Sequence, residues 1–221
     1  MGGFKNEIIN SAFDAGIINV IMAHLTKCSK QMKADCIAAD NFLKNNEDAI
    51  TNRLVAVYLN TQPGIFRYEP QSPEHYDSET GCYIGRTDIK VISRDYFRDE
   101  QAYHIVECKR IDGTIALNQK YITEGVERFF SPTPQPKYSS YYLQNIMFGY
   151  VVQTIDISEN ADKIDKLQGS LLKGATASAF TLKQRENSQY YIYACRYVAA
   201  NTGRTELHHL FFDFANIICK K

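Results

Sequence analysis

Two acidic residues in this chain are each followed two positions later by a lysine: Asp88 precedes Lys90, and Glu107 precedes Lys109. Both pairs lie in short stretches that read as strands, and residues two apart in a strand share one face of the sheet. If the two strands are antiparallel neighbours, Asp88 lies beside Glu107 with Lys109 close by. Two carboxylates with an open side form a hard oxygen site suited to Mg²⁺. A neighbouring lysine can orient a water and stabilise developing negative charge.

The same residues also allow a purely structural interpretation. Charged side chains at strand ends are commonly a solvated face, and two acids near a lysine often form a surface ion pair. Three features favour chemistry. No other acidic residue has a lysine at the second following position, both strands are flanked by apolar residues, and an upstream helix carrying Glu47 can bring a third carboxylate to the same site.

The elements that would position these residues begin with helices. Apolar residues recur at three- and four-residue intervals in the first predicted helix, as in an amphipathic helix: Ile8, Ile9, Phe13, Ile17, Val20, Ile21 and Leu25. A second helix is predicted over 31–43 and a third over 47–60. The third begins after Asn45 or Asn46 as N-cap, and its buried face is predicted to carry Ile50, Leu54 and Val57.

Strands and helices alternate after residue 60. Alternating hydrophobicity and turn residues predict a meander of three strands, at 64–69, 87–93 and 102–109. The later predicted elements are helices at 120–130, 141–147 and 159–173 and strands at 149–154, 190–198 and 206–214. This order indicates an α/β or α+β fold with a mixed sheet. We expect a single domain over 1–221, with a helical part at 1–60 and a sheet-containing core at 61–221.

The ordered placement of the charged residues resembles that of a known superfamily. A glutamate in an N-terminal helix, an aspartate in a second strand and a Glu-x-Lys sequence in a third resemble the PD-(D/E)XK nucleases. The matched positions are Glu47, Asp88, Glu107 and Lys109, with Cys108 as the variable residue. The resemblance spans residues 47 to about 150, and Thr87 stands where the nominal motif has a proline. It implies a restriction-endonuclease-like fold, three layers α/β/α with a mixed central sheet, preceded by N-terminal helices.

The resemblance also implies a metal-dependent phosphodiesterase that leaves a 5′-phosphate and a 3′-hydroxyl. The implied ligands of Mg²⁺, for which Mn²⁺ can substitute, are Asp88, Glu107, the Cys108 carbonyl and Glu47, the last directly or through water. Lys109 would position the attacking water. Gln119, at the start of the following helix, would be a polar helper, although it could equally cap that helix. A looser resemblance, over 120–129 and 149–152, is to bacterial proteins of this superfamily found near restriction or defence systems.

Other residues near these motifs have two interpretations each. Arg128 is one helical turn from Glu124 and would form a surface ion pair or contact a phosphate. A local group of cations would contact a phosphate backbone or form a solvated face: Lys90, Arg94, Lys109, Arg110 and Lys120. Three tyrosines would stack on bases or pack in the core: Tyr138, Tyr141 and Tyr142. The adjacent His208 and His209 lie on opposite faces of a predicted strand, so they do not form one two-ligand site.

Composition limits the classes of protein to consider. The 221 residues include 25 Lys and Arg against 25 Asp and Glu, so the chain differs from a basic, purely electrostatic nucleic-acid binder. The six cysteines form no C-x-x-C pair, and reduced thiols are expected. No apolar run approaches the ~20 residues of a membrane span. Charged residues interrupt the N-terminus where a secretory signal would be apolar, so a cytoplasmic protein without a membrane partner is expected.

The sequence therefore favours a metal-dependent nuclease whose expected partner is nucleic acid, with DNA as the expected substrate. Nucleases that cut both strands often work as dimers, which makes a homodimer the assembly to test. The leading alternative is a binding or assembly module with the same fold and an unused site, which zero net charge favours. Hydrolysis of RNA or of a small nucleotide-like phosphodiester is a third interpretation.

Overall fold

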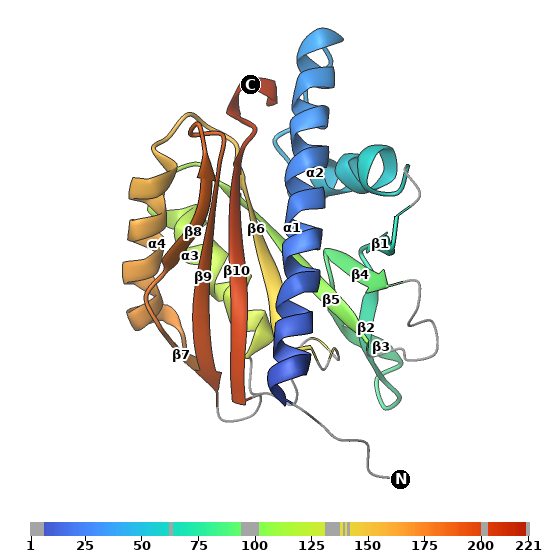
Figure 1. Ribbon diagram of the computed structural model, residues 1–221, viewed down its shortest axis with the longest axis vertical. Coiled ribbons are helices and arrows are strands. Elements are labelled where there is room, and N and C mark those ends of the chain that lie inside the picture. Colours follow the sequence, from blue (N-terminus) through green and yellow to red (C-terminus); the bar gives the residue numbers. More distant parts are fainter. Residues whose placement is uncertain are drawn as a thin grey trace.

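A mixed sheet of eight strands forms the centre of the protein (Figure 1). The computed structural model describes residues 7–61, 64–93, 102–130, 138, 140, 142–199 and 203–219. In spatial order the strands are β1 (Phe66–Pro70), β4 (Ile89–Ser93), β5 (Tyr103–Ile111), β6 (Gln144–Val151), β10 (Gly203–Asp213), β9 (Tyr190–Ala199) and β7 (Ala175–Ala177), and β8 (Thr181–Glu186) also pairs with β9. The β5–β6 and β6–β10 pairs are parallel, and the other pairs are antiparallel.

Helices pack on both faces of this sheet. One face is covered by α1 (Glu7–Ala38), α2 (Glu47–Leu54) and the π-helical turn Val55–Leu59. The other is covered by α3 (Ile115–Thr123), the 3₁₀ turn Val126–Phe129 and α4 (Ile157–Leu171). In Figure 1, α1 crosses the sheet beside β6 and β10, and α4 lies at the opposite side of the molecule from α2. Two hydrophobic clusters, one on each face, hold these layers together.

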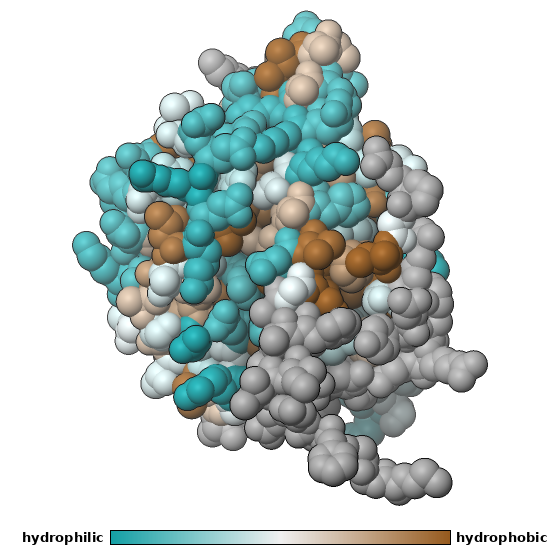
Figure 2. Space-filling view, viewed as in Figure 1, coloured by the Kyte–Doolittle hydropathy of each residue, from teal (hydrophilic) through white to brown (hydrophobic). Residues whose placement is uncertain are grey.

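The first predicted helix is confirmed but is longer than predicted. Residues 31–38 continue α1, so the separate helix predicted over 31–43 is wrong. No Gly or Pro between 26 and 38 would end the helix. Ile21 is buried as predicted, whereas Val20 is exposed. The outer surface near α1 is largely hydrophilic in the upper half of Figure 2.

The third predicted helix has the predicted start. Asn46 is its N-cap, with its side chain accepting a hydrogen bond from the backbone amide of Ala49 at 2.9 Å. Ile50 and Leu54 are buried as predicted, but Val57 is exposed. The reason is the change from α- to π-helical geometry at Val55, which rotates the following residues away from the 3.6-residue period.

The predicted meander is confirmed as β1, β4 and β5, with an insertion that the sequence did not predict. Between β1 and β4 the chain forms a hairpin of β2 (Pro73–Asp77) and β3 (Cys82–Arg86), which is separate from the main sheet. The short strands β7 and β8 were also not predicted. Each of these four strands has at most one buried residue, so they lack the apolar alternation that marks a half-buried strand.

The helix predicted over 141–147 is wrong, because β6 begins at Gln144. All residues from 145 to 151 are buried, as in a central strand covered on both faces. Such a strand reads as one continuous apolar run, which periodicity does not distinguish from a buried helix. The helix predicted at 120–130 is only partly right, because α3 begins at Ile115 and ends at Thr123 and a 3₁₀ turn follows at Val126–Phe129. The helix predicted at 159–173 corresponds to α4, and the last two predicted strands correspond to β9 and β10. The segment 131–137, which contains Pro132, Pro134 and Pro136, lies outside the described residues.

The buried His209 gives the fold a predicted pH dependence. Its Nδ1 lies 2.9 Å from the Tyr121 hydroxyl and its Nε2 lies 3.1 Å from the Tyr197 hydroxyl. Burial, with a smaller contribution from His208, lowers the pKa of His209 to about 3. At this residue the unfolded chain therefore binds more protons below a pH of about 6.5, and the contribution of His209 to the free energy of unfolding falls as the pH falls from there, by up to about 1.4 kcal/mol per pH unit.

Urea unfolding at several pH values between about 7 and about 5 measures this slope. His209→Gln removes the titrating group, so its slope is expected to be smaller than that of the wild type. Part of the slope remains, because burial also lowers the pKa of His104 to about 4. Equal slopes for the two proteins would contradict the assignment of His209 as a buried neutral histidine.

Candidate functional site

Glu107 and Lys109 lie on the same face of β5, as their spacing predicts. They point toward α3, as do the core residues Ile105 and Ile111 at alternate positions of the strand. The Glu107 side chain is fully buried, and the Lys109 side chain is 8% exposed. A buried ion pair needs several hydrogen bonds to offset its desolvation, so its surroundings decide what it can do.

Two further carboxylates reach this pair because they accept hydrogen bonds from backbone amides of β5 that β4 does not pair with. The pairing of β4 with β5 ends at Val106, whereas β5 continues to Ile111 beside β6. Beyond that point the amide of Cys108 donates to Asp88 Oδ2 at 2.7 Å, and the amide of Arg110 donates to Glu47 Oε2 at 3.1 Å. Because buried strand amides need acceptors, the difference in length between β4 and β5 draws both acids to the same place.

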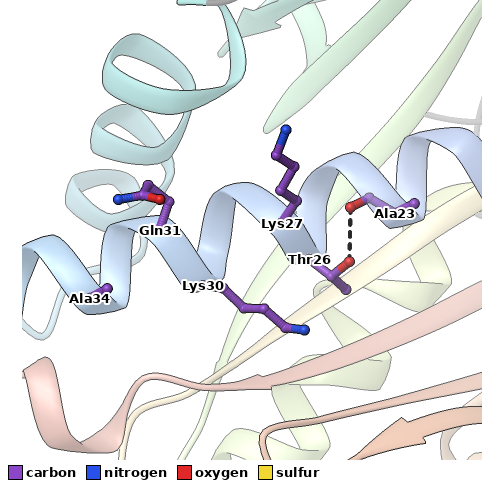
Figure 3. Close-up of a pocket in the computed structure, with 6 residues that line it drawn as sticks. All are labelled: Ala23, Thr26, Lys27, Lys30, Gln31 and Ala34. Carbon is purple, nitrogen blue, oxygen red and sulfur yellow. Dashed lines mark hydrogen bonds between the residues drawn. The ribbon is translucent and has the colours of Figure 1, made fainter.

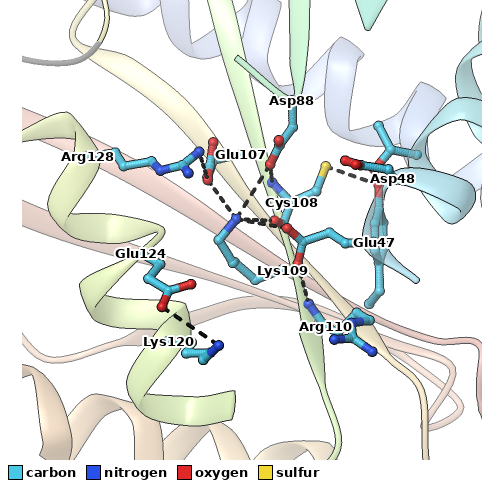
Figure 4. A network of polar contacts seen from close by, with 12 residues as sticks. Glu47, Asp48, Asp88, Glu107, Cys108, Lys109, Arg110, Lys120, Glu124 and Arg128 are labelled. Atoms are coloured by element: carbon cyan, nitrogen blue, oxygen red, sulfur yellow. Dashed lines mark hydrogen bonds and ion pairs between the residues drawn. The ribbon is translucent and has the colours of Figure 1, made fainter. Parts of the chain in front are cut away.

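The three predicted acids all approach the ammonium of the predicted lysine, Lys109, as Figure 4 shows. Its Nζ lies 2.8 Å from Glu107 Oε1, 3.0 Å from Glu47 Oε1 and 3.7 Å from Asp88 Oδ2. It also donates to the Cys108 carbonyl at 2.7 Å. Burial alone would lower the pKa of Lys109, but the three carboxylates outweigh it and raise this pKa, so the lysine is charged.

Arg128 and Tyr138 complete the surroundings of Glu107. Arg128 Nη1 donates to Glu107 Oε1 at 2.8 Å, and the Tyr138 hydroxyl donates to Glu107 Oε2. Burial and the charge of Asp88 raise the pKa of Glu107 to about 7, although Lys109 and Arg128 favour its charged form. Glu107 is thus held by three donors from three parts of the chain.

These contacts correct the sequence interpretation of Arg128 as a partner of Glu124 and confirm the core interpretation of Tyr138. Arg128 pairs with Glu107 and not with Glu124, whose partner is Lys120 at 3.8 Å. Tyr138 is buried against Glu107 and is not free to stack on bases. The sequence carried no signal for either contact, because 3₁₀ geometry at Arg128 replaces the predicted helix.

The turn before Arg128 depends on a glycine. A Cβ at Gly125 would lie 2.5 Å from the Tyr121 carbonyl oxygen and 3.2 Å from Lys109 Cγ. The chain therefore passes close to the stem of Lys109 only because residue 125 has no side chain. This close approach allows Arg128 to reach Glu107.

A cavity of about 270 Å³ opens onto Lys109. It is lined by Asn46, Glu47, Asp48, Arg86, Lys109, Arg110, Leu117, Lys120 and Glu124. Asp88 and Glu107 do not line it, so Lys109 lies between the cavity and these two carboxylates. Four cations and three acids surround the opening, and two of these seven residues, Arg86 and Asp48, were not predicted. Arg86 comes from the unpredicted hairpin and lies 3.6 Å from Asp48.

Two larger cavities lie elsewhere and lack this chemistry. One, of about 470 Å³, is lined only by α1 residues, where Lys27 and Lys30 point to different sides of the helix (Figure 3). Lys30 is paired with Glu186 at 2.5 Å. The other, of about 640 Å³, lies between α1 and strands β8 to β10. Among the cavities of the described residues, the one beside Lys109 is the candidate site because seven charged side chains line it, whereas the charged lining of the largest cavity is Lys183 and Glu206, with His208.

Cys108 contributes its backbone and not its thiol. Its carbonyl accepts the hydrogen bond from Lys109, while its thiol lies on the other face of β5, 3.0 Å from the Tyr150 hydroxyl. Burial raises the pKa of this thiol well above the usual range. A nucleophilic role for Cys108 is therefore disfavoured, since the thiolate is the reactive form.

The structure does not bring Gln119 to the site. Its side chain is exposed on α3 and does not line the cavity, and the cap of this helix is Thr114. Both interpretations of Gln119 are therefore wrong. The next residue of α3, Lys120, lines the cavity instead.

The remaining predicted residues are divided between the site and the core. Arg110 and Lys120 line the cavity, whereas Lys90 lies over the Tyr103 ring at 3.9 Å from its centroid. Tyr142 stacks on His104 with 4.3 Å between ring centroids. Arg94 and Tyr141 lie outside the described residues. His208 and His209 lie on opposite faces of β10 as predicted.

Comparison of the chain with protein-family models, with curated proteins and with solved structures finds no significant match to any of them. Within the ranges that the structure describes, no helix is both long and apolar enough to cross a membrane. The same residues contain no group of three or more His, Cys, Asp or Glu side chains already arranged as metal ligands. The functional proposal therefore rests on geometry alone. We use the term Lys109 cluster for the five charged side chains that meet at the site: Glu47, Asp88, Glu107, Lys109 and Arg128.

Thiol reactivity tests the placement of Cys108. Cys82 and Cys219 are exposed, whereas Cys28, Cys36, Cys108 and Cys195 are buried, and all six are free thiols. We expect an aromatic disulfide reagent to label two thiols of the native protein quickly and all six after denaturation. The Cys82→Ser, Cys219→Ser double variant should then show no fast reaction. Fast labelling of Cys108 in that variant would contradict its burial.

Removal of Lys109 tests the energetic role of the cluster. Lys109→Met leaves Glu107, Asp88 and Glu47 without their shared cation, and we expect it to lower the free energy of unfolding by about 3–5 kcal/mol. Lys163→Met is the matched control, because Lys163 forms only an exposed pair with Glu159 and should cost less than about 1 kcal/mol. Urea unfolding of both variants measures the difference. Equal costs would show that the buried cluster is not stabilised through Lys109.

Proposed function

We propose that the protein is a metal-dependent nuclease with a restriction-endonuclease-like fold and that DNA is its substrate. The observation that carries the proposal is that three carboxylates, those of Glu47, Asp88 and Glu107, all lie against the Lys109 ammonium beside a cavity. These residues come from α2, from the turn before β4 and from β5. Their order along the chain is that of the motif that the sequence resembles: Glu47 begins a helix, Asp88 directly precedes the second strand of the meander, and Glu107 and Lys109 lie on the third.

The topology supports the proposed fold. The strands β1, β4 and β5 form an antiparallel meander in the main sheet, and α3 then connects β5 to the parallel strand β6. Helices lie on both faces of the sheet, as a three-layer α/β/α arrangement requires. The N-terminal α1 lies outside this minimal unit and covers one face of it.

The donor atoms fit a hard divalent cation. Asp88, Glu107, Glu47 and the Cys108 carbonyl present only oxygen atoms, which are the ligands that Mg²⁺ prefers, and all four oxygens already contact one positive charge. These residues would hold Mg²⁺ or Mn²⁺. Bound there, the ion would supply positive charge for the scissile phosphate and lower the pKa of a bound water.

The chain's own cations would act on the substrate. Lys109 lines the cavity and can donate hydrogen bonds to a water or to a phosphate oxygen. Arg86, Arg110 and Lys120 surround the opening and would contact neighbouring phosphates. These contacts concentrate positive charge locally, so a chain of zero net charge can still bind a nucleic-acid backbone.

A cleavage assay on DNA and RNA with Mg²⁺ or Mn²⁺ tests the proposal. Asp88→Asn, Glu107→Gln and Lys109→Met are each expected to lower the rate by roughly a hundredfold or more. Glu159→Gln is the matched control, because Glu159 lies on α4 and pairs only with Lys163 among the contacts described. Loss of cleavage with retained folding, and full activity of the control, is the expected result. Cleavage that survives in Asp88→Asn and Glu107→Gln would contradict the proposal.

A second candidate is a binding or assembly module with this fold. The observation that favours it is the engagement of both Glu107 oxygens by Lys109, Arg128 and Tyr138. An acid held in this way can serve structure alone. Stable protein that shows no cleavage of DNA or RNA with either metal would favour the module over the enzyme.

A further inference from the structure

The oxygen atoms proposed to bind a metal are the same atoms that bind the Lys109 ammonium. Glu107 Oε1, Glu47 Oε1, Asp88 Oδ2 and the Cys108 carbonyl oxygen all lie within 3.7 Å of Nζ. A divalent cation on these oxygens would repel the ammonium at this distance. The Lys109 ammonium and a divalent cation therefore do not bind the four oxygens at the same time.

The position of Lys109 relative to the cavity adds a second constraint. Lys109 and Glu47 line the cavity, but Asp88 and Glu107 lie behind them. A cation that enters from the cavity meets the ammonium before it meets Asp88 or Glu107. Lys109 must move for the two buried acids to become ligands, and its flexible four-carbon stem permits that movement.

Arg128 holds the same oxygen of Glu107 from the other side. Its Nη1 lies 2.8 Å from Glu107 Oε1, and its side chain is 28% exposed. Among the described residues, its Nε is buried without a hydrogen-bond partner. Arg128 does not line the cavity, so a phosphodiester that enters there reaches Lys109 and leaves Arg128 on Glu107.

We propose that the Lys109 ammonium and a divalent cation compete for these oxygens, and that a phosphodiester in the cavity relieves the competition by drawing Lys109 onto its own oxygens. The inference rests on the proposed function and specifies how the site is controlled. Metal binding is weak without substrate and strong with it. The three carboxylates and two cations of the cluster carry one net negative charge, and loss of either cation makes the cluster more attractive to a divalent ion.

Calorimetric titration with Mg²⁺ and Mn²⁺ tests the competition. Lys109→Met is expected to bind the ions roughly tenfold more tightly than the wild type, although it is expected to be inactive. A phosphorothioate DNA duplex, which resists cleavage, should tighten metal binding to the wild type by roughly tenfold and to Lys109→Met by much less. A methylphosphonate duplex, whose backbone has no charge, should leave wild-type affinity unchanged.

Two controls keep the result interpretable. Lys163→Met removes an exposed lysine far from the cluster and should bind the ions as the wild type does. If Lys109→Met does not fold, Arg128→Met decides the question, because it frees Glu107 Oε1 from one of its two cations and keeps Lys109. Its metal affinity should rise by roughly threefold or more.

The inference is overturned if the folded variants bind the ions no more tightly than the wild type, or if the phosphorothioate duplex acts equally on wild type and Lys109→Met. A wild type that cleaves DNA while these affinities stay equal would overturn this inference and leave the proposed nuclease function standing. Tighter metal binding by the variants, without cleavage of DNA or RNA by the wild type, would support the competition and overturn the nuclease function.

Discussion

The site depends on the backbone amides that β5 exposes where β4 ends. Cys108 and Arg110 need acceptors for their amides at a buried edge, and Asp88 and Glu47 supply them. This requirement brings two acids from distant parts of the sequence to within reach of Lys109. The arrangement of the charges is therefore set by strand lengths, which are properties of the fold, and the cluster is built into the sheet and not added to its surface.

A cluster with this origin is held from several directions. Lys109 and Glu107 project from β5, Glu47 begins α2, and Arg128 follows the close turn at Gly125. Each element packs in one of the two hydrophobic clusters, so the layers fix where each charge lies. The low exposure of the group strengthens every electrostatic interaction in it. That is the environment in which a small number of charged groups can activate a phosphate, and equally one in which they can lock a fold.

The sequence predicted the four central residues and the elements that carry them, because their signals are local. Residue spacing on β5 and the cap at Asn46 follow from short-range rules. The surface ion pair of Arg128 with Glu124 was wrong because the actual partner, Glu107, is distant in the chain and the 3₁₀ turn changes the direction of the Arg128 side chain. For Tyr138 the core interpretation was right, although the sequence did not name Glu107 as its partner. The start of β6 was misassigned because a strand buried on both faces has no polar side to set its period. The prediction that Gln119 reaches the site was wrong for a simpler reason, because one position along a helix changes the direction of a side chain by about 100°.

The two carboxylate oxygens of Glu47 accept from different donors, and this has an evolutionary consequence. One of its oxygens accepts from the Arg110 amide and the other from Lys109, so the residue serves the sheet and the site at once. Asp88 also contacts both the Cys108 amide and the lysine. Selection for folding alone would therefore retain acceptors at both positions, and it would also retain Lys109, because its loss leaves buried carboxylates without their shared cation. The presence of these residues in a related sequence would therefore not by itself mark that relative as an enzyme.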